Sequence, residues 1–128
     1  MNGFVRHIKR LVLALVVLMF SFSAHAQSAA NELSGCLQSG NAACLSNHIG
    51  SAIAMTLDNN RSTYSRVQAD MVLRNFFKKN NPKSFKAAKS SDSHLIGMLN
   101  TDKGVYRVYI SMNATRNGYA LQEIRIER

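Results

Sequence analysis

Several residue types are scarce in this sequence, and each shortage excludes a class of protein. Its 128 residues include one proline, two cysteines, no tryptophan and seven acidic residues. Beyond residue 26 the only histidines are His48 and His94, too few for a metal centre built on imidazole. The two cysteines lack the C-x-x-C spacing of a redox site. Because the chain has neither repeats nor a low-complexity linker, we expect residues 27–128 to form one domain. We expect this domain to hold no metal or cofactor.

The longest apolar stretch has the pattern of a secretory signal peptide over residues 1–26. Arg6, Lys9 and Arg10 precede the run LVLALVVLMFSF, and Ala24-His25-Ala26 supplies the small residues of a cleavage site before Gln27. The run is shorter than the roughly 20 apolar residues that span a bilayer. We therefore expect a protein exported to the periplasm or beyond, with no later transmembrane segment. An uncleaved N-terminal anchor is the alternative.

Cys36 and Cys44 lie on either side of a turn sequence, Ser39-Gly40-Asn41. On one continuous helix they would lie about 12 Å apart, whereas a disulfide requires Cα atoms within about 7 Å. The chain must therefore turn between them, with Gly40 ending one helix and Asn41 capping the next. In an exported protein this arrangement predicts a disulfide. A pair of reduced, buried thiols is the alternative.

The spacing of apolar residues predicts helices followed by strands. Helical spacing is found over residues 28–39, 42–49 and 64–80. The last of these begins with a capping box formed by Ser65 and Gln68. Strands are predicted over residues 51–57, 84–88, 94–100, 104–112 and 119–127, with a polar turn at 58–63 and a hairpin turn at Asn117-Gly118. Helices followed by an antiparallel sheet indicate an α+β fold.

Four segments together resemble a known family: SGNAACLSNHI, YSRVQADMVLRNFFKKNNPKSF, IGMLNTDKGVYRVYI and LQEIRIER. The resemblance is to the small secreted bacterial family called domain of unknown function 4783, and it covers most of residues 29–127. That family is placed in the nuclear transport factor 2-like superfamily, so the resemblance implies a cone of helices on a curved sheet. It implies no activity, because the family has none established. Two features depart from the family pattern: the cysteines, and His48-Ile49 in place of an aromatic pair.

The resemblance also implies where a pocket would lie, between the helices and the concave face of the sheet. Alternation along the strands places Tyr106, Val108, Ile110 and Ile124 on this face, and Gln122 has the same parity as Ile124. Tyr106 and Gln122 either satisfy each other or the backbone, or they line a pocket for a small apolar ligand. The alternative is that side chains fill this space.

Catalytic candidates are few. Enzymes of the superfamily that move protons near carbonyl groups use an inward carboxylate or histidine with a tyrosine donor. No carboxylate of this chain is expected to point inward, and His48 near Tyr64 is the only candidate pair for an isomerase- or dehydratase-like reaction. A single histidine beside Leu45 is more often a boundary residue, so we favour a protein that is not an enzyme.

The opposite face of the sheet carries charged and aromatic side chains. Arg107 and Tyr109 alternate onto it from one strand, and Glu123 and Arg125 from the next. Such residues can form solvated ion pairs across the strands, or a contact surface for a partner. Members of the superfamily often dimerise through this face, so the resemblance implies a homodimer.

The chain is basic, with a net charge of +9 and no acidic residue between Met71 and Ser91. Six cations fall in that interval: Arg74, Lys78, Lys79, Lys83, Lys86 and Lys89. They form either a solvated face or a patch for an anionic envelope surface or acidic partner. Nucleic acid is not expected as a partner of an exported protein whose patch lacks stacking aromatics.

The sequence therefore predicts an exported, noncatalytic binding or interaction module of the bacterial envelope. The two alternatives are a small protein that binds an apolar ligand and an isomerase- or dehydratase-like enzyme.

Overall fold

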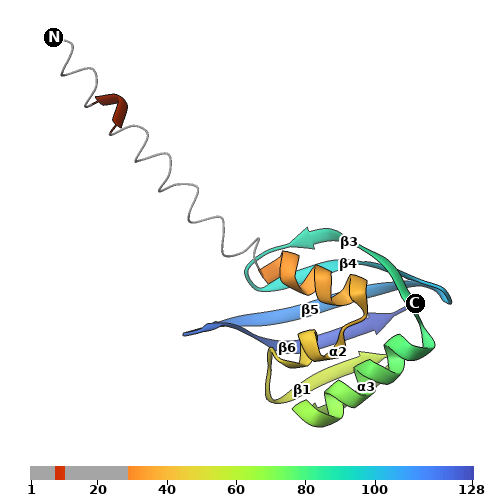
Figure 1. Cartoon of the computed structure of the whole chain (residues 1–128). Helices are drawn as coiled ribbons and strands as arrows, with labels where there is room; N and C mark the ends of the chain where they lie inside the picture. Colours follow the sequence, from red (N-terminus) through yellow and green to blue (C-terminus); the bar gives the residue numbers. More distant parts are fainter. Residues whose placement is uncertain (1–7, 11–28) are drawn as a thin grey trace.

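The computed structural model describes residues 8–10 and 29–128 (Figure 1). Apart from residues 8–10, the predicted signal peptide lies outside the described residues. Residues 29–39 form a helix. It is followed by α2 (Ala42–Ser46), β1 (Ile49–Leu57), β2 (Asn60–Ser65), α3 (Arg66–Lys79), β3 (Pro82–Ser90), β4 (His94–Thr101), β5 (Gly104–Thr115) and β6 (Gly118–Glu127). No helix within the described part of the chain is long and apolar enough to cross a membrane.

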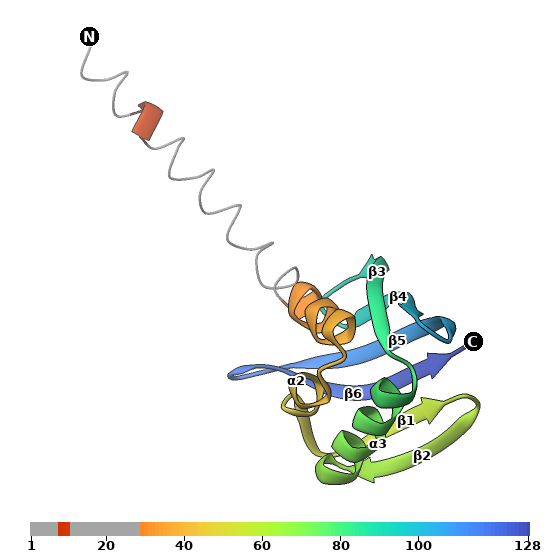
Figure 2. The ribbon, with the colours of Figure 1, turned by 45° about the vertical axis from the view of Figure 1, so that its right-hand side comes forward.

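The six strands form one sheet in the order β2-β1-β6-β5-β4-β3. Neighbouring strands are antiparallel except β1 and β6, which run parallel. The sheet is curved, and the helices cover one of its faces, which we call the inner face (Figure 2). The predicted α+β fold of helices packed on a curved sheet is therefore confirmed, with one parallel pair that the sequence did not indicate.

Strand β2 lies where the sequence predicts only a polar turn over residues 58–63. The turn is limited to Asp58 and Asn59, which adopt positive φ angles of 46° and 70°. Asp and Asn tolerate this left-handed region, so two residues are enough to reverse the chain. Because β2 is an edge strand whose side chains are exposed except for the half-buried Tyr64, no apolar alternation marks it in the sequence.

The capping box predicted for the third helix is present at the start of α3. The Ser65 side chain accepts a hydrogen bond from the Gln68 backbone, and the Gln68 side chain accepts one from the Ser65 backbone. This satisfies two backbone donors that would otherwise lack partners at a helix start. The helix ends at Lys79, and Asn80 donates its backbone N–H to Phe76.

The predicted disulfide between Cys36 and Cys44 is present, with Cα atoms 5.5 Å apart. Gly40, between the two helices, has a φ of +64°, and the Asn41 side chain accepts from the Cys44 backbone N–H. The second helix is shorter than predicted and ends at Ser46. It stops early because Ile49 already begins β1 and pairs with Leu121 of β6.

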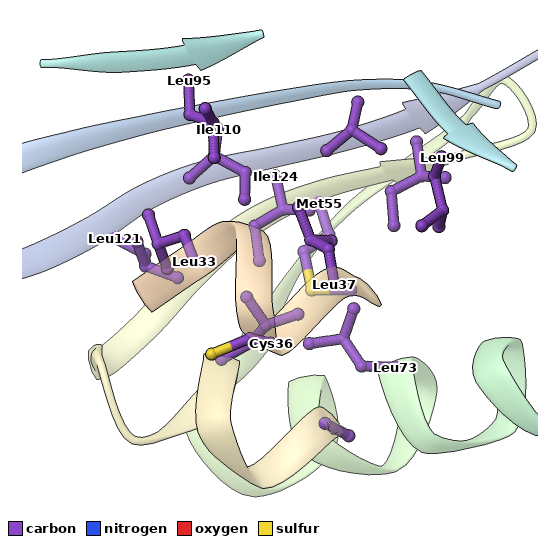
Figure 3. Close-up of a cluster of buried hydrophobic side chains, with 14 of the residues drawn as sticks. Leu33, Cys36, Leu37, Met55, Leu73, Leu95, Leu99, Ile110, Leu121 and Ile124 are labelled. Atoms are coloured by element: carbon purple, nitrogen blue, oxygen red, sulfur yellow. The ribbon is translucent and has the colours of Figure 1, made fainter. Parts of the chain in front are cut away.

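The core fills the space between the helices and the inner face of the sheet. Leu33 and Leu37 of the first helix and Leu73 of α3 point toward Ile110 and Ile124 of the sheet (Figure 3). All five side chains are completely buried. Burying a leucine or isoleucine of this kind stabilises the fold by about 1.5–3 kcal/mol.

Gly97 of β4 allows the Phe85 ring and the backbone of β3 to approach unusually closely. It lies on the inner face of β4, opposite Ala87 of β3, and the ring of Phe85 packs over it. A Cβ atom at this position would lie 2.5 Å from the Lys86 carbonyl oxygen and 2.5 Å from Phe85 Cζ. The absence of a side chain therefore lets Phe85 cover this end of the core.

Candidate functional site

The residues expected to line an inner pocket take part in the core, with one exception. Tyr106, Val108, Ile110 and Ile124 are at most 1% exposed and pack in the cluster that includes the helices. Gln122 is exposed, so the expectation that it faces the helices is wrong.

A β-bulge explains the error at Gln122. In the pairing of β5 with β6, Ser111 lies opposite Glu123, but the next residue, Met112, lies opposite Leu121. Gln122 is the extra residue, so the alternation of side chains inverts there and Leu121 takes the buried place. Simple parity in the sequence cannot show this inversion.

The buried hydroxyl of Tyr106 has partners other than those predicted. It donates to Asn80 Oδ1 at 2.8 Å and accepts from Arg128 Nη2 at 2.8 Å. The Arg128 guanidinium also lies over the Tyr106 ring, 4.9 Å from its centroid. Tyr106 therefore joins the end of α3 and the C-terminal residue to the middle of the sheet.

Replacing Tyr106 with phenylalanine should lower the free energy of unfolding by about 1–2 kcal/mol, because Asn80 would lose its buried donor. Urea unfolding followed by circular dichroism measures this change. The matched control is Tyr109→Phe. The Tyr109 side chain is half-buried and its hydroxyl makes no hydrogen bond within the described residues, so this variant should change stability by less than about 0.5 kcal/mol. Equal stabilities for the two variants would contradict a structural role for the Tyr106 hydroxyl.

His48 lies in a polar cluster whose other members the sequence did not indicate. Its Nε2 atom is 2.7 Å from Glu32 Oε1 and 3.3 Å from the Tyr119 hydroxyl, and its ring stacks on that of Tyr119 at 4.4 Å. The structure does not pair His48 with Tyr64, which lies opposite Ile53 in the β1–β2 pair.

Burial, followed by the negative charge of Glu32, raises the pKa of Tyr119 far above its ordinary value, so the phenol stays protonated. The His48 and Glu32 side chains are 22% and 47% exposed, so water reaches the cluster. A carboxylate, an imidazole and a phenol could exchange protons, but the arrangement lacks the enclosed surroundings that strengthen such chemistry.

On the outer face, one row of side chains crosses all six strands. Each residue of the row is the cross-strand partner of the next, in the order Lys89, Ile96, Tyr109, Arg125, Thr56 and Arg61. The Arg125 guanidinium lies over the Tyr109 ring at 4.4 Å. Glu123 Oε1 lies 3.0 Å from Arg125 Nε and 3.8 Å from Arg61 Nη1. The Arg125 Nε atom is buried, but its N–H is not aligned for a hydrogen bond to Glu123.

The predicted outer-face residues therefore lie side by side. Tyr109, Glu123 and Arg125 form one contact network, and Arg107 lies in the adjacent row between Met98 and Glu127. Met98 is 43% exposed and Val105, near the start of β5, is 49% exposed. The outer face thus combines guanidinium groups with an aromatic ring and exposed apolar side chains.

A half-open pocket of about 450 Å³ lies at one end of this face, where β3 turns into β4. It is lined by Lys89, Ser90, Ser91, His94, Ile96 and Tyr109. The sequence did not indicate it, because its walls come from three strands and the turn between two of them. Among the described residues, no group of three or more His, Cys, Asp or Glu side chains could hold a metal ion.

The basic residues are divided between two sides of the sheet. Arg74 belongs to α3 and pairs with Asp70 at 2.9 Å, and its hydrogen bond, together with one from Ser46, holds the pKa of Asp70 below its usual value. Lys78 and Lys79 occupy the last turn of the same helix.

Lys83, Lys86 and Lys89 lie on β3, where the register places Lys86 opposite Met98 and Lys89 opposite Ile96. The six cations predicted as one patch are thus split between a helix on the inner face and a strand whose Lys86 and Lys89 belong to the outer face.

The model of the family described as "Domain of unknown function (DUF4783)" matches residues 30–127. A DUF4783 family protein from Bacteroides fragilis is similar in structure, with a TM-score of 0.71 and 25% identity over 76% of this chain and 95% of that one. One from Bacteroides uniformis has a TM-score of 0.71 and 24% identity over 77% and 94%.

A putative dehydratase of the NTF2-like family from Streptomyces avermitilis has a TM-score of 0.56 and 9% identity over 84% of this chain and 96% of that one. At this identity the likeness concerns the fold alone. No curated protein matches the chain.

Proposed function

The chain belongs to the DUF4783 family and has an NTF2-like fold, and we propose that it is a noncatalytic binding module of the bacterial envelope that acts through the outer face of its sheet. The observation that carries this proposal is the contact between Tyr109 and Arg125, with the exposed Met98 in the neighbouring row of the same face. Tyrosine and arginine dominate the binding energy of protein interfaces. Their mutual contact also holds them in place before a partner arrives, which lowers the entropic cost of binding.

A binding role is favoured over catalysis by the surroundings of the polar groups. The cluster of Glu32, His48 and Tyr119 is open to water, and the Glu32 carboxylate is already engaged by His48. The buried hydroxyl of Tyr106 is engaged by Asn80 and Arg128. Catalytic side chains work best when a polar group is free to meet the substrate in an enclosed space. Neither the cluster around His48 nor the Tyr106 hydroxyl offers such a group.

Export is supported by the disulfide between Cys36 and Cys44. Disulfides form and persist in oxidising compartments and are rare in the reducing cytosol. The signal-like pattern of residues 1–26 points in the same direction.

We propose further that the outer face joins two copies of the chain in a homodimer. A two-fold interface must be complementary to itself. The outer face meets this condition because it alternates arginines, Arg107 and Arg125, with the carboxylates Glu123 and Glu127 on neighbouring positions. An arginine of one copy can therefore meet a carboxylate of the other.

The double variant Arg107→Ala/Tyr109→Ala should raise the dimer dissociation constant by at least about 100-fold, because each residue would be lost twice per dimer. Sedimentation equilibrium of the disulfide-bonded protein measures this constant. Lys78→Ala, on the last turn of α3, is the matched control and should leave it unchanged. Circular dichroism confirms that each variant is folded. A wild-type protein that stays monomeric at high micromolar concentration would overturn the homodimer.

A further inference from the structure

We propose that the pocket between the β3–β4 turn and Tyr109, which we call the outer pocket, binds a small molecule with an apolar body and one anionic group. It is distinct from the predicted inner pocket, because its walls belong to the opposite face of the sheet. Its volume of about 450 Å³ lies within the range of roughly 300–1,000 Å³ that is usual for ligand sites. A single chain presents all of its walls, but Tyr109 also belongs to the proposed dimer face, so the inference is tested on the monomeric chain.

The apolar part of the ligand would rest on Ile96 and on the edge of the Tyr109 ring. These two residues are cross-strand neighbours, and both are half-buried. The ring of Tyr109 is held between the Arg125 guanidinium, 4.4 Å from its centroid, and the His94 ring at 5.6 Å. Because its orientation is fixed in this way, the apolar floor exists before a ligand binds, and little entropy is lost on binding.

The polar wall of the outer pocket favours an anion. Lys89 lies opposite Ile96 across the β3–β4 pair and is the lysine among the residues that line the pocket. His94 accepts or donates at Nδ1 with the Ser93 hydroxyl at 2.8 Å, which leaves its Nε2 without a hydrogen bond within the described residues. No carboxylate lines the pocket, and Glu123, which lies nearby in the register, is paired with Arg125.

The turn that closes the pocket is itself well held. The Ser91 hydroxyl accepts from the backbone N–H groups of Ser93 and His94 at 3.2 and 3.1 Å, and the Ser91 backbone N–H donates to the His94 carbonyl at 2.8 Å. Four backbone groups of a short turn are thus satisfied internally. The turn therefore acts as a fixed rim, and Lys89 and His94 supply the groups that remain free to meet a ligand.

The test uses two probes that differ in one charged group. 8-Anilinonaphthalene-1-sulfonate carries an apolar body with a sulfonate, and N-phenyl-1-naphthylamine has the same body without it. Fluorescence titration of the folded, disulfide-bonded protein should show tighter binding of the sulfonate. Lys89→Ala should weaken sulfonate binding by about tenfold, the effect of one charge-assisted hydrogen bond, and leave the neutral probe unchanged. Ile96→Ala should weaken both probes by about fivefold.

Matched controls distinguish binding in the outer pocket from binding elsewhere on the protein. Lys103→Ala, in the β4–β5 turn, removes the same charge outside the pocket and should change neither titration. Arg107 does not line the pocket, so Arg107→Ala should leave probe binding unchanged in titrations made at protein concentrations where the chain is monomeric. Amide shifts in two-dimensional NMR should change on addition of the sulfonate at Lys89, Ser91, His94, Ile96 and Tyr109. Absence of sulfonate binding, or shifts confined to the helices, would overturn the proposal.

A lipid headgroup would present Lys89 with the same anionic chemistry as a free small molecule. Cosedimentation with vesicles of equal phosphatidylglycerol and phosphatidylcholine distinguishes these sources. We expect no cosedimentation that depends on Lys89, because the outer pocket needs an apolar body to reach Ile96. Vesicle binding that Lys89→Ala abolishes would assign the anion to a membrane surface and overturn the small-molecule ligand.

Discussion

Replacing Gly97 with alanine should lower the free energy of unfolding by about 2–3 kcal/mol, although alanine ordinarily suits a strand better than glycine does. The new Cβ atom would lie 2.5 Å from the Lys86 carbonyl oxygen, a backbone atom that cannot move without disturbing the β3–β4 pair. It would also lie 2.5 Å from Phe85 Cζ, and the Phe85 ring would have to leave a place where it is only 9% exposed. Urea unfolding followed by circular dichroism measures the loss.

Gly50 provides the matched control for this substitution. It lies in β1, its backbone has no positive φ angle, and a Cβ atom there would meet nothing within 4 Å. Gly50→Ala should therefore leave stability unchanged or raise it by up to about 1 kcal/mol, through the smaller entropy of the unfolded chain. If Gly97→Ala proved as stable as Gly50→Ala, the close packing of Phe85 on Gly97 would be refuted.

Removing the disulfide should have an effect of similar size. On the chain-entropy model, the nine residues from Cys36 to Cys44 form a loop whose closure contributes about 2.6 kcal/mol. The variant Cys36→Ala/Cys44→Ala avoids leaving a free thiol and keeps a small apolar residue at Cys36, which is 1% exposed. For a domain of this size such a loss corresponds to a fall in Tm of roughly 10–20 °C, which differential scanning calorimetry measures.

Reduction of the wild-type protein supplies the control for the double variant. Dithiothreitol should lower the Tm of the wild type by a similar amount and leave that of the variant unchanged. Mass spectrometry of the exported protein should show a non-reduced chain about 2 Da lighter than the reduced chain, because a disulfide lacks two hydrogens. Equal masses, together with no effect of dithiothreitol, would contradict the bond.

The regular features of the fold could be predicted from local patterns in the sequence. The capping box at Ser65 and Gln68 and the turn between Cys36 and Cys44 depend on neighbouring residues, so short-range rules were sufficient. Strand β2 was missed because an exposed edge strand needs no apolar alternation. Gln122 was misplaced because a bulge inverts parity at one residue, and nothing in the local sequence marks it.

The candidate sites were harder to predict, since they join residues that are distant in the sequence. The cluster around His48 combines Glu32 of the first helix with Tyr119 of β6, 71 residues beyond His48. The outer pocket depends on the register of β3, β4 and β5, which brings Lys89 and Tyr109 to the two sides of Ile96. Alternation identified the outer face itself, but only the register shows where that face is hollow.

The central position of β6 makes the last strand the one that unites the sheet. β6 lies between β1 and β5, so it joins two parts of the sheet, β2-β1 and β5-β4-β3, that are otherwise not paired with each other. The contacts that join them link positions such as Met55 and Ile124, which lie far apart in the sequence. Such long-range contacts form slowly. The single sheet is therefore complete only when β6 has paired on both of its edges.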